Sequence, residues 1–379
     1  MRAPFVLGLL GAAGCSNLLG ITDPSTKSDD GSPPPMIDAE VDSAIDAPPP
    51  CTAPTAFGAE ASFDVEPGAT GLSLALGKLD AGATLDVAIA IGTDVVILHG
   101  DGTGVFANPT KLGSVAGQVL IDDFDTDARD DLILVQVGGS KVAIRRQSPA
   151  GTFLAEQPLA GPFTNLHRAL VGQLDGNVRP DLYIEDDVER RIWTSGALTP
   201  GSFLRENTTI GVAGDQLLSI EQIDRAQRDE TVLVDGSGNV KLSINSTAAP
   251  KTIATGATGR GAAFGKFNGD MFPDLVIATA AGGVLFFQDP ANPGTFVMQA
   301  GLIPEVTGDS LQVLDVNGDG TDDIITPTRI VLQCPGAPAT FTQVEGFNAK
   351  QPSLFADVNG NGKPDLLRLE GGTLKVRLQ

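Results

Sequence analysis

The chain has 379 residues and carries 47 Asp and Glu against 25 Lys and Arg, so its formal net charge is −22 at pH 7. Nucleic-acid binders need a basic face that displaces counterions from phosphates, and the composition therefore excludes that class. Hydrophobic residues make up 41% of the chain, enough for a core, while 46 Gly and 26 Pro favour many turns and short strands over long helices.

Residues 1–14 are expected to be a signal peptide. A single cation, Arg2, precedes the apolar run Phe5–Ala13, which is too short to span a bilayer. The stretch Ala12-Ala13-Gly14-Cys15 resembles the lipobox of bacterial lipoproteins, and the resemblance implies that Cys15 is acylated and becomes the new N-terminus. The alternative is a plain secretory signal with an incidental cysteine.

Residues 15–50 then change character, because Asp, Ser and Pro dominate and little remains to bury. Such a segment cannot offset the entropy of ordering, so we expect a disordered tether behind the lipidated cysteine. Together these segments predict a protein of the bacterial cell envelope, lipid-anchored at the outer membrane or secreted. We expect the lipid to be its sole membrane contact.

From residue 51 onward the chain is built of repeats. An acidic turn followed by a dense apolar strand recurs about every 47 residues. The turns end on Asp86, Asp131, Asp181, Glu230, Asp274, Asp323 and Asp365. Each unit carries segments for four short strands, which is typical of a propeller blade. Residues 51–379 are therefore predicted to form an all-β, seven-bladed β-propeller with four antiparallel strands per blade.

The ends of the repeat region are expected to close the ring. The last unit supplies three strands before the chain ends, and residues 56–65 offer a further strand that would complete this last blade. With Cys15 lipidated, Cys51 and Cys334 remain as a pair in an oxidising compartment. We predict a disulfide between them that fixes the closing strand, with two unrelated thiols as the alternative.

The segment Phe264–Leu275, together with the turns that begin at Asp315 and Asp357, resembles the FG-GAP/VCBS repeat family. Its best-known members are the integrin α-subunit propellers. The resemblance covers residues 56–379, and it implies a β-propeller whose acidic turns are calcium loops.

The residues of these turns support the same interpretation, because oxygen ligands at alternate positions of a tight turn form a cage for a hard cation. The sixth and seventh units place candidates at Asp315, Asn317, Asp319, Thr321, Asp323, Asp357, Asn359, Asn361, Lys363 and Asp365. Thr321 and Lys363 would contribute backbone carbonyls. Glycines at the bends allow a positive φ.

The second unit offers Asp123, Asp125, Asp127 and Asp131, but Thr126 and Ala128 replace its turn glycines. Lys78 and Lys266 begin the first and fifth turns, where an ammonium could take the place of a metal. We expect two or three structural Ca²⁺ ions, with metal-free Asx turns as the alternative.

Candidate catalytic groups are few, because the chain has two His and three Cys. No nucleophile elbow, zinc-protease motif, phosphate loop or dinucleotide fingerprint is present. His167, Arg168 and Arg260 are candidates for a binding face near the central channel. The acidic run from Glu185 to Arg191 is expected to be a solvated hairpin tip. Trp193 is expected either to pack between blades or to stack on a carbohydrate.

These features favour a non-enzymatic propeller that binds a surface protein or polysaccharide, for example in adhesion. The alternative is an extracellular enzyme on the same scaffold, a hydrolase or lyase acting on glycans or phosphoesters.

Overall fold

The computed structural model describes residues 57–379, apart from 67, 178, 197–201, 211–214, 224–227, 244–249, 255–260, 309, 338 and 345–351. The chain divides into two units, Met1–Ala47 and Pro48–Gln379. The expected signal peptide and tether, as well as Cys15, Cys51 and Arg260, lie outside the described residues.

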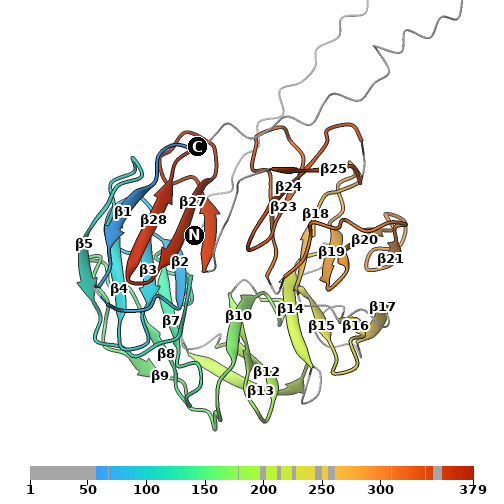
Figure 1. Cartoon of the computed structure of the whole chain (residues 1–379). Coiled ribbons are helices and arrows are strands. Elements are labelled where there is room, and N and C mark those ends of the chain that lie inside the picture. Colours follow the sequence, from blue (N-terminus) through green and yellow to red (C-terminus); the bar gives the residue numbers. More distant parts are fainter. Residues whose placement is uncertain are drawn as a thin grey trace, which may run out of the picture. The chain divides into compact units, whose positions relative to one another are not determined.

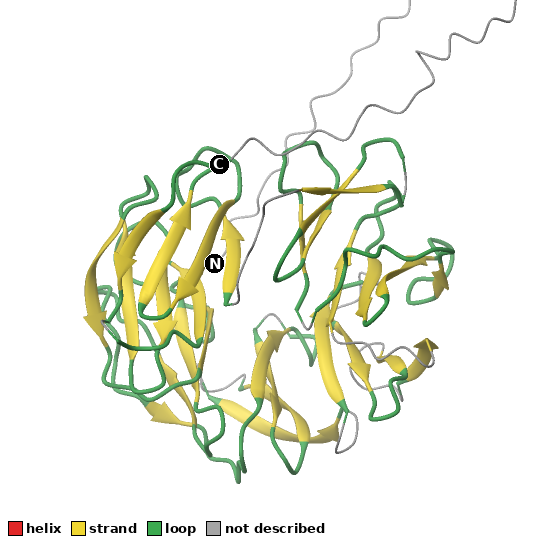
Figure 2. Cartoon of the chain, viewed as in Figure 1, coloured by secondary structure: helices red, strands yellow, loops and turns green. Residues whose placement is uncertain are grey.

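Within the described residues, all regular structure is β, and the strands form seven four-stranded antiparallel sheets (Figures 1 and 2). The seven-bladed propeller is thus confirmed. In these same residues, no helix has the length and apolarity needed to cross a membrane.

Each blade runs from the ring centre outward through four strands. The innermost strands are β2 (Ser73–Gly77), β6 (Gln118–Asp122), β10 (Arg168–Gly172), β14 (Gln216–Glu221), β18 (Gly261–Gly265), β22 (Gln312–Leu314) and β26 (Ser353–Ala356). The second strands are β3 (Asp86–Ala90), β7 (Asp131–Val135), β11 (Asp181–Glu185), β15 (Glu230–Val234), β19 (Asp274–Thr279), β23 (Asp323–Ile325) and β27 (Asp365–Glu370).

The third strands are β4 (Val95–Gly100), β8 (Val142–Arg145), β12 (Arg190–Ser195), β16 (Val240–Ser243), β20 (Gly282–Gln288), β24 (Ile330–Gln333) and β28 (Thr373–Arg377). The outer strands are β5 (Phe106–Lys111), β9 (Gln157–Pro158), β13 (Phe203–Thr209), β17 (Lys251–Ala254), β21 (Phe296–Met298), β25 (Phe341–Val344) and β1 (Ala61–Asp64).

The second strands read as continuous apolar runs because neighbouring blades cover both of their faces. β3 and β7 are buried along their whole length. Residues from facing blades share one core, as where Ala88 and Ile97 of blade one pack with Val119 and Leu132 of blade two. The core therefore lies between blades rather than within them.

The last blade is completed by the N-terminal strand, as predicted. β1 pairs antiparallel with β28, from Ala61 opposite Val376 to Asp64 opposite Thr373. In Figure 1 the two strands, one blue and one red, lie side by side. Phe63 on β1 packs edge-on against Phe106 of blade one, with 5.8 Å between ring centroids. The closing strand thus belongs to blade seven and also contacts blade one.

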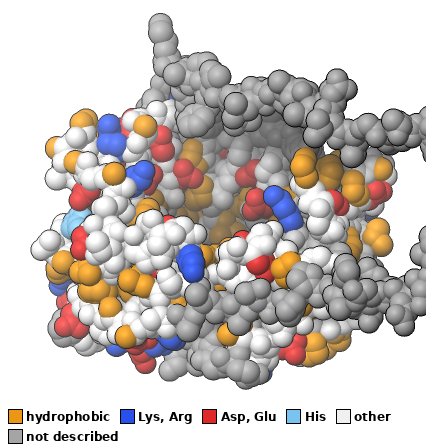
Figure 3. Space-filling view, turned by 90° about the horizontal axis from the view of Figure 1, so that it is seen from above, with side chains coloured by type: hydrophobic (Ala, Val, Ile, Leu, Met, Phe, Trp, Pro, Cys, Tyr) orange, Lys and Arg blue, Asp and Glu red, His pale blue; other side chains and the backbone are white. Residues whose placement is uncertain are grey.

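The innermost strands surround the centre of the ring, and described residues of these strands line open pockets of about 430 and 290 Å³ there. Side chains link neighbouring blades here, since the Gln118 amide exchanges two hydrogen bonds with the backbone of Ala169 on β10. Figure 3 shows one face of the molecule hollowed near its middle, where hydrophobic side chains lie close to acidic ones.

The strand directions give the propeller two distinct ends. The end at which the innermost strands begin is called the strand-start face, and it also carries the turns between second and third strands. The other end is called the cation-loop face, because it carries the acidic loops between first and second strands.

Candidate cation loops and binding face

The acid that closes each acidic loop is completely buried. In blades one, three, five, six and seven it accepts hydrogen bonds both from the loop after the first strand and from a residue near the end of the third strand. In blade five, Asp274 accepts the backbone N–H of Phe267 at 2.9 Å with one oxygen and that of Gln288 at 2.9 Å with the other. Corresponding pairs of bonds hold Asp86, Asp181, Asp323 and Asp365. We call these buried acids, which begin the second strands, the latch acids.

Blade four shows that the latch does not require a cation cage. Its loop has lost the acidic pattern, yet Glu230 is buried and accepts the N–H of Ile223 at 2.9 Å. The sequence analysis treated the last acid of the loops in blades two, six and seven as a metal ligand and missed this backbone role. The available signal was the position of the acid directly before a buried apolar strand.

The loops of blades six and seven bring the predicted ligands together in one turn. One Asp315 oxygen accepts the N–H groups of Gly318 and Asp319, and its other oxygen accepts that of Gly320 at 2.8 Å. Both glycines have a positive φ, 74° and 86°. Asp357 makes the same bonds to Gly360, Asn361 and Gly362. These are Asx turns whose remaining lone pairs could serve a cation.

Negative charge accumulates in these loops. Burial, together with the nearby charges of Asp319 and Asp315, raises the pKa of Asp323 to about 7 despite its two backbone hydrogen bonds. Lys363 and Thr321 each donate a backbone N–H to the side chain two residues earlier.

The loop of blade two has the strongest geometry for a cation. One oxygen each from Asp123, Asp125 and Asp131 lies within 4.8 Å of the others. Asp131 is fully buried, and its Oδ1 accepts the N–H of Gln147 at 2.8 Å. In the described part of the chain, its Oδ2 has no hydrogen-bond partner. Burial and the neighbouring carboxylates raise the pKa of Asp131 to about 7.

A buried acceptor that faces carboxylates and lacks a donor fits a bound cation, because an unpaired buried polar atom is otherwise unfavourable. Oxygen donors suit Ca²⁺ among the common ions. The fourth candidate of this loop, Asp127, forms an ion pair with Arg129 through one oxygen.

The loop of blade two also keeps its shape without glycine. Thr126 has a φ of 61° and Ala128 one of 68°, values close to those of Gly318 and Gly320 in blade six. For a residue with a Cβ, this left-handed conformation is unfavourable by about 1–2 kcal/mol relative to the right-handed one. The replaced glycines therefore leave the predicted cage intact but strained.

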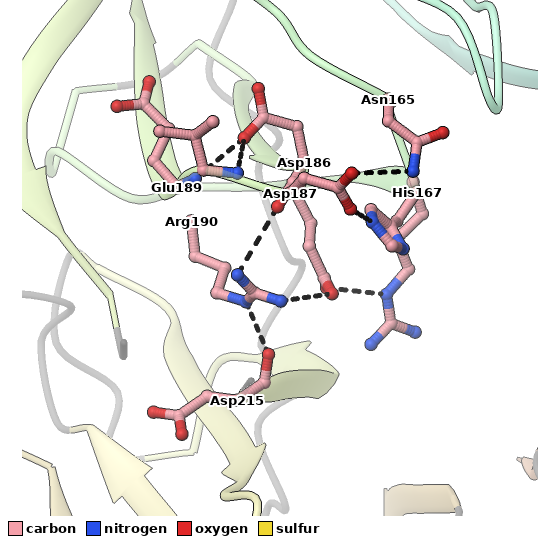
Figure 4. A network of polar contacts seen from close by, with 10 residues as sticks. Asn165, His167, Asp186, Asp187, Glu189, Arg190 and Asp215 are labelled. Carbon is pink, nitrogen blue, oxygen red and sulfur yellow. Dashed lines mark hydrogen bonds and ion pairs between the residues drawn. The ribbon is translucent and has the colours of Figure 1, made fainter. Parts of the chain in front are cut away.

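The run from Glu185 to Arg191 is the expected hairpin between β11 and β12, and Asp187 and Val188 at its tip are exposed, but its other charged groups are largely buried rather than solvated. Glu185, Asp186 and Arg190 are all less than a tenth exposed. Arg190 contacts Glu185 at 3.3 Å and donates from Nε to the Asp215 carbonyl, which belongs to blade four, at 2.5 Å. Figure 4 shows Arg190 between these groups. Packing against the next blade buries the charges, and a single repeat unit cannot reveal that neighbour.

Two of the three binding-face candidates lie at the strand-start face. His167 precedes β10, and its Nε2 lies 2.6 Å from the exposed carboxylate of Asp187 (Figure 4). Arg168 contacts Glu185 through Nε at 3.3 Å, while its Nη2 has no hydrogen-bond partner among the described residues. Arg260 lies outside the described residues.

Of two other expectations, that for Trp193 is resolved and that for the disulfide is not. Trp193 is 2% exposed and packs on Phe163 with 5.2 Å between ring centroids, so of its two expected roles the packing role holds. Cys334 is disulfide-bonded. The predicted partner, Cys51, lies outside the described residues, and the pairing therefore stays a prediction.

Comparison with known proteins agrees with this architecture. Residues 266–326 match the family model of the FG-GAP-like repeat. This stretch is an FG-GAP-like repeat. It runs from the acidic loop of blade five to the second strand of blade six, and the predicted family resemblance is confirmed there. The curated proteins contain no significant match to the sequence.

Three solved structures of different proteins are similar to this chain in fold. A lectin from Agrocybe aegerita that recognises non-reducing terminal N-acetylglucosamine has a TM-score of 0.56 at 14% identity, over 82% of this chain and 86% of the lectin. A chain of the BBS1N complex with ARL6DN has a TM-score of 0.54 at 12% identity, over 86% of this chain and 97% of that one. YCF48 bound to D1 peptide has a TM-score of 0.51 at 13% identity, over 88% of this chain and 99% of YCF48. At such identities these similarities concern the fold.

Proposed function

We propose that this FG-GAP-like propeller is a non-enzymatic binding protein of the bacterial envelope, stabilised by calcium at its cation-loop face. It binds a partner, in the first place a surface protein, through its strand-start face. The N-terminal sequence supports display on a lipid anchor and a tether, because Cys15 follows a lipobox-like stretch and residues 16–50 are rich in Asp, Ser and Pro.

The observation that carries the binding proposal is the composition of the strand-start face. Large apolar side chains that are about half exposed or more lie on this face in the loops of blades one to three and in the connection between blades five and six. They are Leu72, Val115, Val137, Val188 and Leu302. They lie on the same face as the side chains of His167 and Arg168. Exposed apolar groups beside arginine and other polar groups are typical of protein–protein interfaces.

Calcium is assigned to the opposite face and therefore to stability rather than to contact with the partner. The unpartnered Oδ2 of Asp131 supports an ion in blade two. The loops of blades six and seven offer the second and third sites through Asp315, Asp319 and Asp357.

Calorimetry of the full chain tests the calcium assignment. After treatment with chelator, added Ca²⁺ should raise the Tm by a few degrees, because a ligand that binds the native state alone stabilises it. Asp131→Asn retains the acceptor for the Gln147 N–H but removes the charge. This variant should be at least as stable as the wild type in chelator and gain less from Ca²⁺. An unchanged wild-type Tm would contradict the assignment.

Capture from envelope extract tests the binding face. The full chain is immobilised through its N-terminus, and retained proteins are identified by mass spectrometry. A Val137→Asp/Val188→Asp variant should lose a partner that the wild type retains. Met271→Asp is the matched control, because Met271 is 69% exposed on the cation-loop face. Equal retention by all three proteins, or no specific retention, would rule out the proposed face.

A further inference from the structure

Blade one carries a cluster of ligand-type side chains that differs from the calcium loops. Asp80 lies in the β2–β3 loop, Asp86 begins β3, and His99 lies near the end of β4. The His99 Nδ1 atom is 3.5 Å from Asp80 Oδ2 and 3.5 Å from Asp86 Oδ1. One ligand atom from each residue lies within 4.8 Å of the other two.

The oxygen set of this loop is too small for a calcium cage. Lys78 stands where the better loops begin with Asp, and Gly82 stands at the position of Asp319 in blade six. The backbone N–H of Lys78 donates to Asp130 at 2.7 Å, and the side chain found against the two carboxylates is that of His99. Two carboxylates and one imidazole remain, whereas Ca²⁺ takes six to eight oxygens.

His99 is oriented as a ligand. Its Nε2 lies 3.4 Å from the Thr110 hydroxyl on β5, and the tautomer that donates there leaves a lone pair on Nδ1. Nδ1 is shielded from solvent and has no hydrogen-bond partner in the described residues, although the side chain as a whole is 25% exposed. Metal-bound histidines commonly donate their other ring nitrogen to such a second group.

Blade two carries a different residue at the position that His99 occupies in blade one. His99 precedes Gly100, whose N–H binds the latch acid Asp86. The corresponding residue in blade two is Arg146, which precedes Gln147 and approaches Asp125 at 3.9 Å. Both blades therefore bring a nitrogen-bearing side chain from the third strand to the acidic loop. Arginine can contribute charge there, but only histidine can bind a metal.

We propose that Asp80, Asp86 and His99 form a site for a divalent first-row transition metal, best matched by Zn²⁺. Two ligands about 2.0 Å from a tetrahedral zinc ion are about 3.3 Å apart, close to the spacing from Nδ1 to each carboxylate. Mixed nitrogen and oxygen ligands also suit zinc better than calcium. The free Oδ2 of Asp80 is available, because Oδ1 accepts the Gly82 N–H. The bound ion would join the loop to β3 and β4 independently of the proposed calcium sites.

The chain offers a direct test, since it has only two histidines, His99 and His167. In long-range ¹H–¹⁵N spectra of the metal-stripped full chain, one equivalent of Zn²⁺ should move the imidazole signals of His99 and leave those of His167 in place. Excess Ca²⁺ should not reproduce the shift. His99→Gln and Asp80→Asn should weaken Zn²⁺ binding in calorimetry by at least about tenfold.

His167→Gln is the control, because that side chain is exposed and pairs with Asp187 far along the sequence from the cluster. It should bind Zn²⁺ as the wild type does. The proposal fails if His99 titrates with pH but does not respond to Zn²⁺, which would show an imidazolium held between two carboxylates. It also fails if His167→Gln alone removes binding. Neither result would bear on calcium or on the strand-start face.

Discussion

Thr126 and Ala128 show how a single loop can retain a geometry that its residues disfavour. At φ values of 61° and 68°, both occupy the left-handed region that glycine fills in blades six and seven. The carboxylate of Asp123 holds the loop there, since it accepts the N–H groups of Asp127 and Ala128 at 2.9 Å each. The side chain of the first acid thus fixes the backbone.

Replacing Ala128 by glycine should therefore stabilise the protein. Relief of the left-handed strain contributes about 1–2 kcal/mol, and the greater freedom of glycine in the unfolded chain offsets about 0.5–1 kcal/mol of it. We expect a net gain on the order of 0.5–1 kcal/mol in urea unfolding. The control is the reverse substitution, Gly320→Ala, at a φ of 86° in blade six, which should lower stability. A loss on Ala128→Gly would show that the loop is not strained.

At the scale of strands, the latch acids explain how five of the seven blades hold the second strand both to the loop before it and to the third strand. Asp274 is the test case, because it is 0% exposed and its loop begins with Lys266 rather than Asp. Asp274→Ala should leave the N–H groups of Phe267 and Gln288 without acceptors. Since each of the two buried donors left unpaired is unfavourable by about 1–3 kcal/mol, we expect the free energy of unfolding to fall by about 2–6 kcal/mol at pH 7.5.

The stability that Asp274→Ala removes should be larger at lower pH. Burial, with a contribution from the charge of Asp270, raises the pKa of Asp274 to about 6. Because the folded state binds this proton more tightly than the unfolded state, Asp274 adds stability at low pH that is lost as pH rises towards 6. Chelator-treated wild type should thus gain about 1 kcal/mol relative to the variant at pH 5. Urea unfolding at both pH values measures this. A loss that shrinks at pH 5 would show an unprotonated, charge-paired Asp274.

The element scale also shows where sequence reasoning succeeded and failed. The apolar strands that follow the acidic turns were predictable, because neighbouring blades bury both of their faces and so require continuous hydrophobic residues. The place of each latch acid, directly before a buried apolar strand, could also be read from the sequence, but its partners could not, because those of Asp274 are the backbone N–H groups of Phe267 and Gln288. The position of His99 was missed for a related reason, since its approach to Asp80 depends on the third strand's register.

At the scale of the whole molecule, the period predicted the number of blades, and the missing strand of the last unit predicted ring closure. Interactions between blades were beyond the sequence. The burial of Arg190 depends on Asp215 of the next blade, and the pair cannot be inferred from either repeat alone. In a ring, each blade is therefore stabilised in part by residues of the adjacent blade.

Closure by β1 should be the point at which the ring opens first. Phe63 connects β1 to blade one through Phe106, and Glu60 pairs with Arg368 of β27 at 2.7 Å. Phe63→Ala removes the aromatic contact, so β1 should detach from β28 more often than the rest of the ring unfolds. We expect faster hydrogen exchange at the backbone amides of β28, together with a fall of about 2 kcal/mol in the free energy of unfolding.

Phe203→Ala separates closure from simple loss of packing. Phe203 is also half-buried on an outer strand and meets Phe124 edge-on, with 5.7 Å between ring centroids, but its strand β13 joins no chain ends. This variant should lose a similar amount of stability, because the removed side chain and its environment are alike. Its β28 amides should stay protected. If they exchange as fast as in Phe63→Ala, the ring opens elsewhere and β1 is an ordinary edge strand. If the β28 amides exchange faster in Phe63→Ala than in Phe203→Ala, the ring opens first between β1 and β28, where strand pairing and not chain connectivity closes it.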